Sequence, residues 1–83
     1  MTQVFARIAG TGSYLPEKVL TNDDLAKIVD TDDAWIRSRV GIRTRHVAAP
    51  DETVDSMAAA AAAKALAASG LAPQDIDLVL VAT

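Results

Sequence analysis

An indole and a guanidinium four residues apart are the pair of side chains best suited to bind a ligand. Trp35 is the only tryptophan of the sequence, and Arg39 follows it by one helical turn, so both belong to one helix face. An indole stacks on a nucleotide base, and a guanidinium stacks on rings or pairs with phosphate. The same spacing fits a half-buried tryptophan covered by an arginine stem, so the pair predicts either a nucleotide contact or ordinary packing.

A cluster of basic residues surrounds this pair. It consists of Arg37, Arg39, Arg43, Arg45 and the single histidine, His46. In a chain of net charge −3, such a segment favours an anionic ligand or an acidic partner protein. The alternative is a set of ion pairs with the aspartates between residues 23 and 33. We expect His46 to be structural, because no nucleophile or orienting acid is near it in the sequence.

Several kinds of chemistry are excluded by composition. The absence of cysteine excludes a disulfide, a thiolate metal site and a cysteine nucleophile within these residues. The aspartate pairs at 23–24 and 32–33 stand at expected helix starts, where capping explains them. Gly10 and Gly12 do not form a dinucleotide-binding motif, because the third glycine position is occupied by Leu15. We therefore assign no catalytic residue and no metal ligand to this chain.

Local signals predict the order strand, helix, helix, strand, helix, strand. The expected elements are a strand at 4–9, a helix from Thr21 or Asn22 through Val29, a helix at about 33–40, a strand or extended segment at 42–47, a helix at about 54–68, and a strand at 76–83. Gly10 and Gly12 permit a tight turn or a close backbone approach. Gly41 and Gly70 fit the positions that follow helix ends. The alanine-rich helix is expected to be buried on more than one side.

The last strand carries the strongest sign that the fold needs more polypeptide. Residues 78–82 are apolar without alternation, which is typical of a strand covered on both faces in a layered α/β sheet. The sequence is 51% hydrophobic, but 17 of those residues are alanine, so little large apolar surface is available. We expect another segment or a partner chain to cover this strand; the alternative is an edge strand covered by its own helix.

Other broad classes of protein are also disfavoured by the sequence. The net charge of −3 argues against nucleic-acid binding, and no apolar run is long enough to span a membrane. The first residues lack the basic and apolar regions of a signal peptide. We expect a soluble, cytoplasmic protein.

Several motifs together resemble the N-terminal part of β-ketoacyl-acyl-carrier-protein synthase III. They are GTGSYLP at 10–16, Thr21-Asn22, DAWIRSRVGIRTRH at 33–46, DET at 51–53 and VLVAT at 79–83. The resemblance implies an α/β, thiolase-like layered αβαβα fold, of which residues 1–83 form the N-terminal part of the first half-domain. It also implies a homodimer, completed by the remainder of the same enzyme.

The resemblance further implies a reaction and a binding role. The reaction is decarboxylative Claisen condensation of a short acyl-CoA with malonyl-acyl carrier protein, at the start of type II fatty-acid synthesis. The catalytic cysteine, histidine and asparagine of the family lie downstream of this region, and coenzyme A enters as a substrate thioester, without a further cofactor. The residues that match family positions near coenzyme A are Thr31 at the adenine edge, Trp35 stacking on adenine, and Arg39 near the nucleotide.

Two alternatives to this interpretation stay open. One is a related condensing enzyme of secondary metabolism with the same N-terminal region. The other is a small nucleotide-binding or interaction module without catalytic activity.

The resemblance also implies a role for the remaining arginines, which are expected to help receive the acidic carrier protein.

Overall fold

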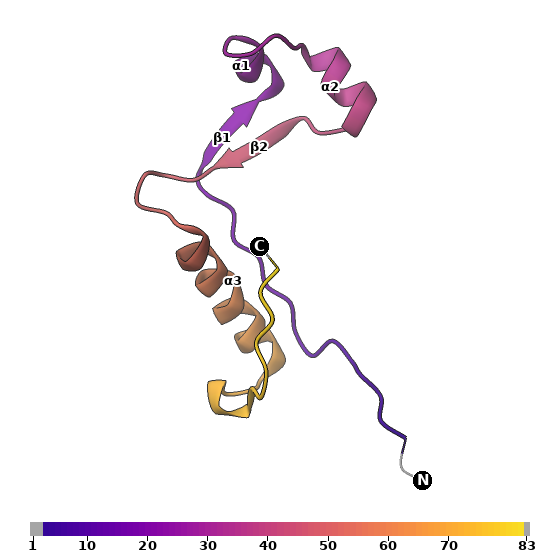
Figure 1. The fold of residues 1–83 in the computed structure, drawn as a ribbon, viewed down its shortest axis with the longest axis vertical. Coiled ribbons are helices and arrows are strands. Elements are labelled where there is room, and N and C mark those ends of the chain that lie inside the picture. Colours follow the sequence, from indigo (N-terminus) through magenta and orange to yellow (C-terminus); the bar gives the residue numbers. More distant parts are fainter. Residues whose placement is uncertain (1–2, 83) are drawn as a thin grey trace. The chain divides into compact units, whose positions relative to one another are not determined.

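The computed structural model describes residues 3–82, which divide into two compact units (Figure 1). One unit is Leu15–Thr53. The other combines the chain up to Tyr14 with the chain from Val54 onward. In chain order the elements are β1 (Lys18–Thr21), α1 (Asn22–Ala26), α2 (Asp33–Val40), β2 (Thr44–Val47), α3 (Val54–Ser69) and the 3-10 helix η1 (Pro73–Asp75).

The unit Leu15–Thr53 is built on a two-stranded antiparallel sheet. Lys18 pairs with Val47 and Thr21 pairs with Thr44. Helices α1 and α2 lie at the end where β1 finishes and β2 begins (Figure 1). The expected extended segment at 42–47 is confirmed over β2, whereas β1 is a strand that the sequence analysis did not predict.

Helix α1 begins at a reciprocal cap. The Thr21 hydroxyl oxygen accepts a hydrogen bond from the Asp24 backbone N–H at 3.1 Å. The Asp24 carboxylate accepts one in return from the Thr21 backbone N–H at 3.0 Å. This capping box satisfies two backbone donors that the helix itself leaves without partners. The hydrogen bonds from Thr21, the backbone one foremost, lower the pKa of Asp24.

Helix α1 is shorter than predicted. It ends at Ala26, because the Ile28 N–H bonds to the Leu25 carbonyl at 2.9 Å and so tightens the chain into a turn. The predicted continuation through Ile28 and Val29 is therefore wrong, and Ile28 is 70% exposed.

Helix α2 has the predicted bounds. Its N-cap is Asp32, whose carboxylate accepts a hydrogen bond from the Trp35 N–H at 2.7 Å. Gly41 ends it with a φ of 75° and bonds its N–H to the Arg37 carbonyl. Left-handed backbone of this kind favours glycine. Ile36 is the one buried residue of α2 and is 7% exposed.

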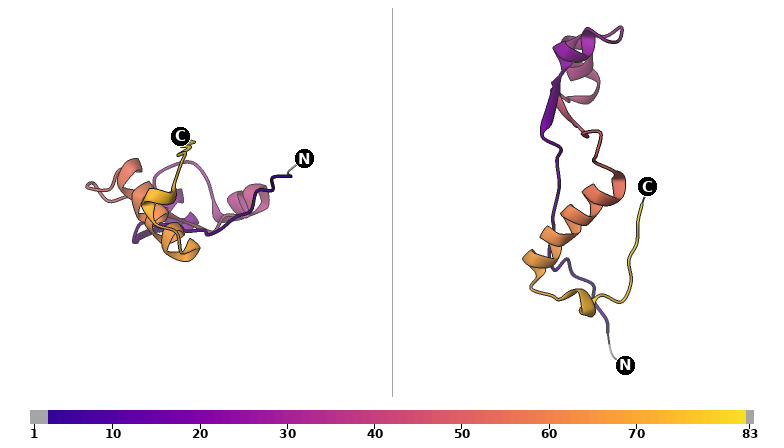
Figure 2. Two further views of the ribbon diagram at one scale, coloured as in Figure 1. Left: turned by 90° about the horizontal axis from the view of Figure 1, so that it is seen from below. Right: turned by 90° about the vertical axis from the view of Figure 1, so that its left-hand side faces the viewer.

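The second unit is organised around α3, which is one unbroken helix followed by η1 (Figure 2). The run of alanines from Ala58 to Ala63 favours the helix without loss of side-chain freedom. Gly70 follows its end with a φ of 73°. None of its residues is buried, so the prediction that it is covered on more than one side is wrong for this chain. No helix among residues 3–82 is long and apolar enough to cross a membrane.

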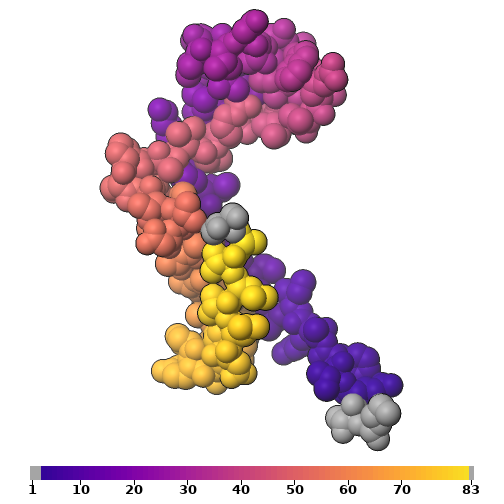
Figure 3. Space-filling view, in the orientation of Figure 1, coloured from indigo at the N-terminus to yellow at the C-terminus, as the bar shows by residue number. Residues whose placement is uncertain are grey.

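The strands predicted at 4–9 and 76–83 are not formed in the part of the chain that the structure describes; Thr83 lies outside it. Both segments lack a partner strand with which to form a ladder. Their large side chains are consequently exposed, Phe5 by 84% and Leu80 by 86%. The segment 76–82 is the yellow stretch in the space-filling view (Figure 3).

Of the two alternatives for Gly10 and Gly12, a tight turn or a close backbone approach, the structure shows the close approach. A Cβ atom added to Gly10 would lie 2.7 Å from the Ser69 backbone nitrogen. One added to Gly12 would lie 2.6 Å from the Ala65 backbone nitrogen. Since real Cβ atoms do not come this close to other atoms, only glycine lets the N-terminal segment lie against α3 in this way.

Candidate functional site

Helix α2 brings together the two residues that the sequence analysis paired. The guanidinium carbon of Arg39 lies 5.5 Å from the centre of the Trp35 ring, within the range of a cation–π contact. The tryptophan nevertheless remains 55% exposed. The arginine therefore covers the ring as the packing alternative predicts, while more than half of the tryptophan stays accessible to a ligand.

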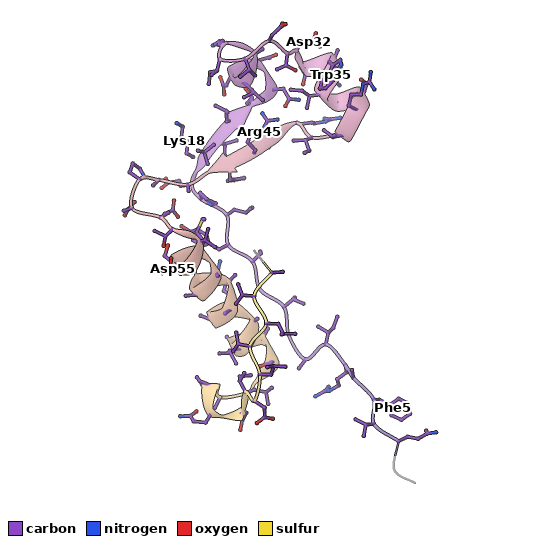
Figure 4. The ribbon with its side chains drawn as sticks, in the orientation of Figure 1. Phe5, Lys18, Asp32, Trp35, Arg45 and Asp55 are labelled. Atoms are coloured by element: carbon purple, nitrogen blue, oxygen red, sulfur yellow. The ribbon has the colours of Figure 1, made fainter. Side chains whose placement is uncertain are left out.

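A hollow of about 270 Å³ lies beside this tryptophan. It is lined by Asp30, Thr31, Asp32 and Trp35, and Figure 4 labels Asp32 and Trp35 at the start of α2. Thr31 is half-buried there, so two of the three predicted contact residues border one space. Arg39 is not part of this lining.

The charges around the tryptophan are separated. The hollow carries two carboxylates, Asp30 and Asp32, whereas Arg39 brings a positive charge over the ring. Carboxylates disfavour phosphate by like-charge repulsion and accept hydrogen bonds from N–H donors. The arrangement suits a molecule with a neutral ring bearing N–H donors at one end and anionic groups at the other.

A buried amide holds α2 to the rest of its unit. The Asn22 Nδ2 group donates to the Asp33 carboxylate and to the Ile42 carbonyl, both at 2.8 Å. Its Oδ1 accepts from Arg45 Nη2 at 2.7 Å; Figure 4 labels Arg45 on β2. The sequence pattern predicts for Asn22 only a place at the start of a helix. Its partners are 11 to 23 residues away, so no local pattern identifies them.

The basic cluster is largely engaged within its own unit. Arg37 forms an ion pair with Asp33 at 2.8 Å, as the ion-pair alternative predicts. The pKa of Asp33 is lowered, chiefly by the hydrogen bond from Asn22 and also by the Arg37 charge. Arg45 is bound to Asn22. These contacts reduce the number of arginines available to an acidic partner.

His46 has a structural contact. Its Nδ1 atom is hydrogen-bonded to the carbonyl oxygen of Pro16. Pro16 is a buried residue. The expectation of a structural histidine is consistent with this geometry. Within residues 3–82 no three histidine, cysteine or acidic side chains are grouped so that they could hold a metal ion.

The second unit contains a larger hollow of different character. Its volume is about 470 Å³, and its lining is almost entirely apolar, including Ile8, Leu66, Leu71 and Val79. No titratable side chain lines it. The polar side chain in its lining is that of Ser69, whose hydroxyl donates to the Leu66 carbonyl at 2.7 Å and accepts from the Leu71 N–H at 3.1 Å.

Known sequences match nearly the whole chain. It is 73% identical over 78 residues to β-ketoacyl-[acyl-carrier-protein] synthase III 2 of Streptomyces avermitilis, covering 94% of this chain and 25% of that protein. It is 59% identical over 81 residues to the synthase III of Xanthomonas campestris, covering 98% and 25%. The chain thus spans about a quarter of the length of these curated relatives. No family model matches it.

Solved structures agree with these sequence matches. The 3-oxoacyl-[acyl-carrier-protein] synthase III of Aquifex aeolicus has a TM-score of 0.78 at 53% identity, over 84% of this chain and 22% of that chain. The priming β-ketosynthase of the R1128 polyketide biosynthetic pathway has a TM-score of 0.80 at 41% identity, over 86% and 21%. The predicted thiolase-like α/β fold, N-terminal part only, is confirmed by these similarities.

Proposed function

We infer that this chain, which is similar in sequence and fold to the N-terminal quarter of β-ketoacyl-acyl-carrier-protein synthase III, supplies part of the coenzyme A entrance of such an enzyme. The complete protein would condense a short acyl-CoA with malonyl-acyl carrier protein, with loss of carbon dioxide. Residues 1–83 would be the N-terminal part of its first half-domain, completed by the remainder of the enzyme in a homodimer. No residue of this chain is given a catalytic role.

The observation that carries the proposal is the accessible indole of Trp35 with Arg39 over its ring. The adenine of coenzyme A would stack on the accessible part of the indole. Thr31 borders the same hollow, and its hydroxyl would hydrogen-bond the base edge.

The charge distribution supports one orientation of the nucleotide. The carboxylates of Asp30 and Asp32 favour the adenine amino group in the hollow, since an amine donates to an acceptor. Arg39 would meet the phosphates, which carry the negative charge of coenzyme A. The acyl-pantetheine arm would then lead away from α2 toward the reacting centre, outside this chain.

The experiment compares two acyl donors in the complete synthase that contains this chain. Trp35→Ala should raise KM for an acyl-CoA by about 5-fold to 150-fold, because stacking a base on an aromatic ring is worth about 1–3 kcal/mol. Acyl-pantetheine lacks the nucleotide, so its KM should not change, nor should that of malonyl-acyl carrier protein. Equal losses with all three substrates would contradict the proposal.

Arg39→Gln is the matched variant for the phosphate end. Its KM for acyl-CoA should rise. The difference in KM between this variant and the unchanged enzyme should become smaller as salt is added, because salt screens exposed charge pairs. A salt-independent difference would count against phosphate recognition.

A second candidate is a priming condensing enzyme of secondary metabolism. The similarity to the R1128 priming β-ketosynthase favours it. The two candidates share the proposed nucleotide contact and differ in the acyl donor and carrier protein that they use. Turnover with malonyl-acyl carrier proteins from fatty-acid and from polyketide synthesis would separate them.

A further inference from the structure

The most buried side chain described in this chain is a polar one. Asn22 is 1% exposed, and its side-chain amide groups and its backbone N–H all have partners. Its Nδ2 donates twice and its Oδ1 accepts once, while its backbone N–H donates to the Arg43 carbonyl at 3.2 Å. Such complete pairing is what makes a buried amide tolerable.

The partners of this amide lie at the two ends of α2. Asp33 is the first residue of the helix, and Ile42 follows Gly41, which ends it. One NH2 group therefore holds the start and the end of α2 together. Through Arg45 the same side chain is tied to β2, so the helix is fixed relative to the sheet.

Helix α2 has few other means of being fixed. It contains eight residues and buries only Ile36, and a helix of this length is marginal by itself. Trp35 and Arg39 lie on it, and their positions depend on where it is held. The hydrogen bonds of Asn22 go to other residues than these two.

We propose that Asn22 is a positioning residue that sets the affinity for acyl-CoA by holding both ends of the helix that carries Trp35 and Arg39. This rests on the proposed nucleotide contact. The mechanism predicts an effect on KM for acyl-CoA with little effect on kcat, because the reacting centre lies outside this chain and the helix binds only the nucleotide.

The test uses the complete synthase with four variants: Asn22→Asp, Asp33→Asn, the double exchange of the two, and Asp23→Asn as control. Asn22→Asp removes both N–H donors and sets a second carboxylate against Asp33. It should raise KM for acyl-CoA about tenfold or more and leave KM for malonyl-acyl carrier protein unchanged. Asp23→Asn alters the charge of the neighbouring residue outside this network and should change neither constant.

The KM of the double variant, Asn22→Asp with Asp33→Asn, is the decisive measurement. An amide at position 33 can donate to a carboxylate at position 22, which restores the link and keeps the Arg45 contact. KM for acyl-CoA should then fall several-fold from its value in Asn22→Asp, although the Ile42 carbonyl stays without its donor. If Asn22→Asp fails to fold, the double exchange is compared with the unchanged enzyme: a folded double variant with a KM for acyl-CoA close to the unchanged value is expected, and a double variant that also fails to fold would overturn the proposal.

The possible failures are distinguishable. If Trp35→Ala leaves KM for acyl-CoA unchanged, the nucleotide contact itself is wrong. If Trp35→Ala raises KM but Asn22→Asp behaves like Asp23→Asn, the positioning role is refuted. A double exchange whose KM stays as high as that of Asn22→Asp, or a loss confined to kcat, would also overturn it.

Discussion

Replacing Gly12 with alanine is expected to destabilise the complete synthase that contains this chain. The cause is steric and not conformational. The described residues with positive φ are Gly41 and Gly70, so the backbone of Gly12 has a conformation that alanine also adopts. An alanine Cβ at position 12 would overlap the Ala61 carbonyl oxygen, its nearest neighbour, and would lie 2.6 Å from the Ala65 backbone nitrogen. Ordinary van der Waals contact begins at 3.4 Å, so the N-terminal segment and α3 would have to separate by more than 0.8 Å.

The expected cost follows from the rigidity of the obstructing atoms. A side chain can rotate away, but a backbone nitrogen in the middle of α3 cannot move without bending the helix. Overpacking of this kind costs about 1–3 kcal/mol. A loss of about 2 kcal/mol corresponds to a decrease in Tm of about 3 °C in a protein about four times as long as this chain, the length of its relatives.

Calorimetry on two matched variants would check this reasoning. Gly41→Ala meets nothing within 4 Å, so its expected cost of about 1 kcal/mol comes from the left-handed backbone alone. Ala65→Gly combined with Gly12→Ala should not restore stability, since the obstruction at Ala65 is its backbone nitrogen. An unchanged Tm in Gly12→Ala, or rescue by Ala65→Gly, would refute the close-approach argument.

Two further predictions concern the unit Leu15–Thr53. Thr21→Val removes the hydroxyl that caps α1 and should cost about 1 kcal/mol in denaturant unfolding, whereas Thr21→Ser, which keeps the bond to Asp24, should cost less. The lowered pKa of Asp33 means that its contribution to stability is complete above the ordinary value of 3.8 and is lost as the pH falls through the lower value of the folded protein. Asn22→Ala should move the Asp33 carboxyl titration, followed by carbon NMR, up toward 3.8; an unmoved titration would show that Arg37 and not the amide lowers it.

Helix bounds were predictable where the signals lie within the helix and its caps. Asp32 and Gly41 mark both ends of α2, and the alanine run with Gly70 marks α3. These signals act through hydrogen bonds between neighbouring residues, so the sequence contains all that decides them.

Strands were predicted less well, because a strand exists only with a partner. The segments 4–9 and 76–83 have the composition of strands, but no described segment pairs with either. Conversely, β1 was missed because its four residues give little pattern, and its pairing with β2 is the property that defines it.

The candidate site shows the same division between local and distant interactions. The contact of Trp35 with Arg39 follows from a four-residue spacing and was predicted. The role of Asn22 was missed, because the amide joins Asp33, Ile42 and Arg45 across a fold that no short pattern encodes.

The unpaired apolar segment near the end of the described chain has a consequence for handling the protein. Residues 78–82 combine high β-propensity with no charge and are free of proline, and their large side chains face solvent. An extended backbone of this kind offers unused N–H and C=O groups to any other strand edge. At high concentration, copies of this chain would therefore add to one another through this segment and precipitate as cross-β aggregates, unless a neighbouring strand occupies it first.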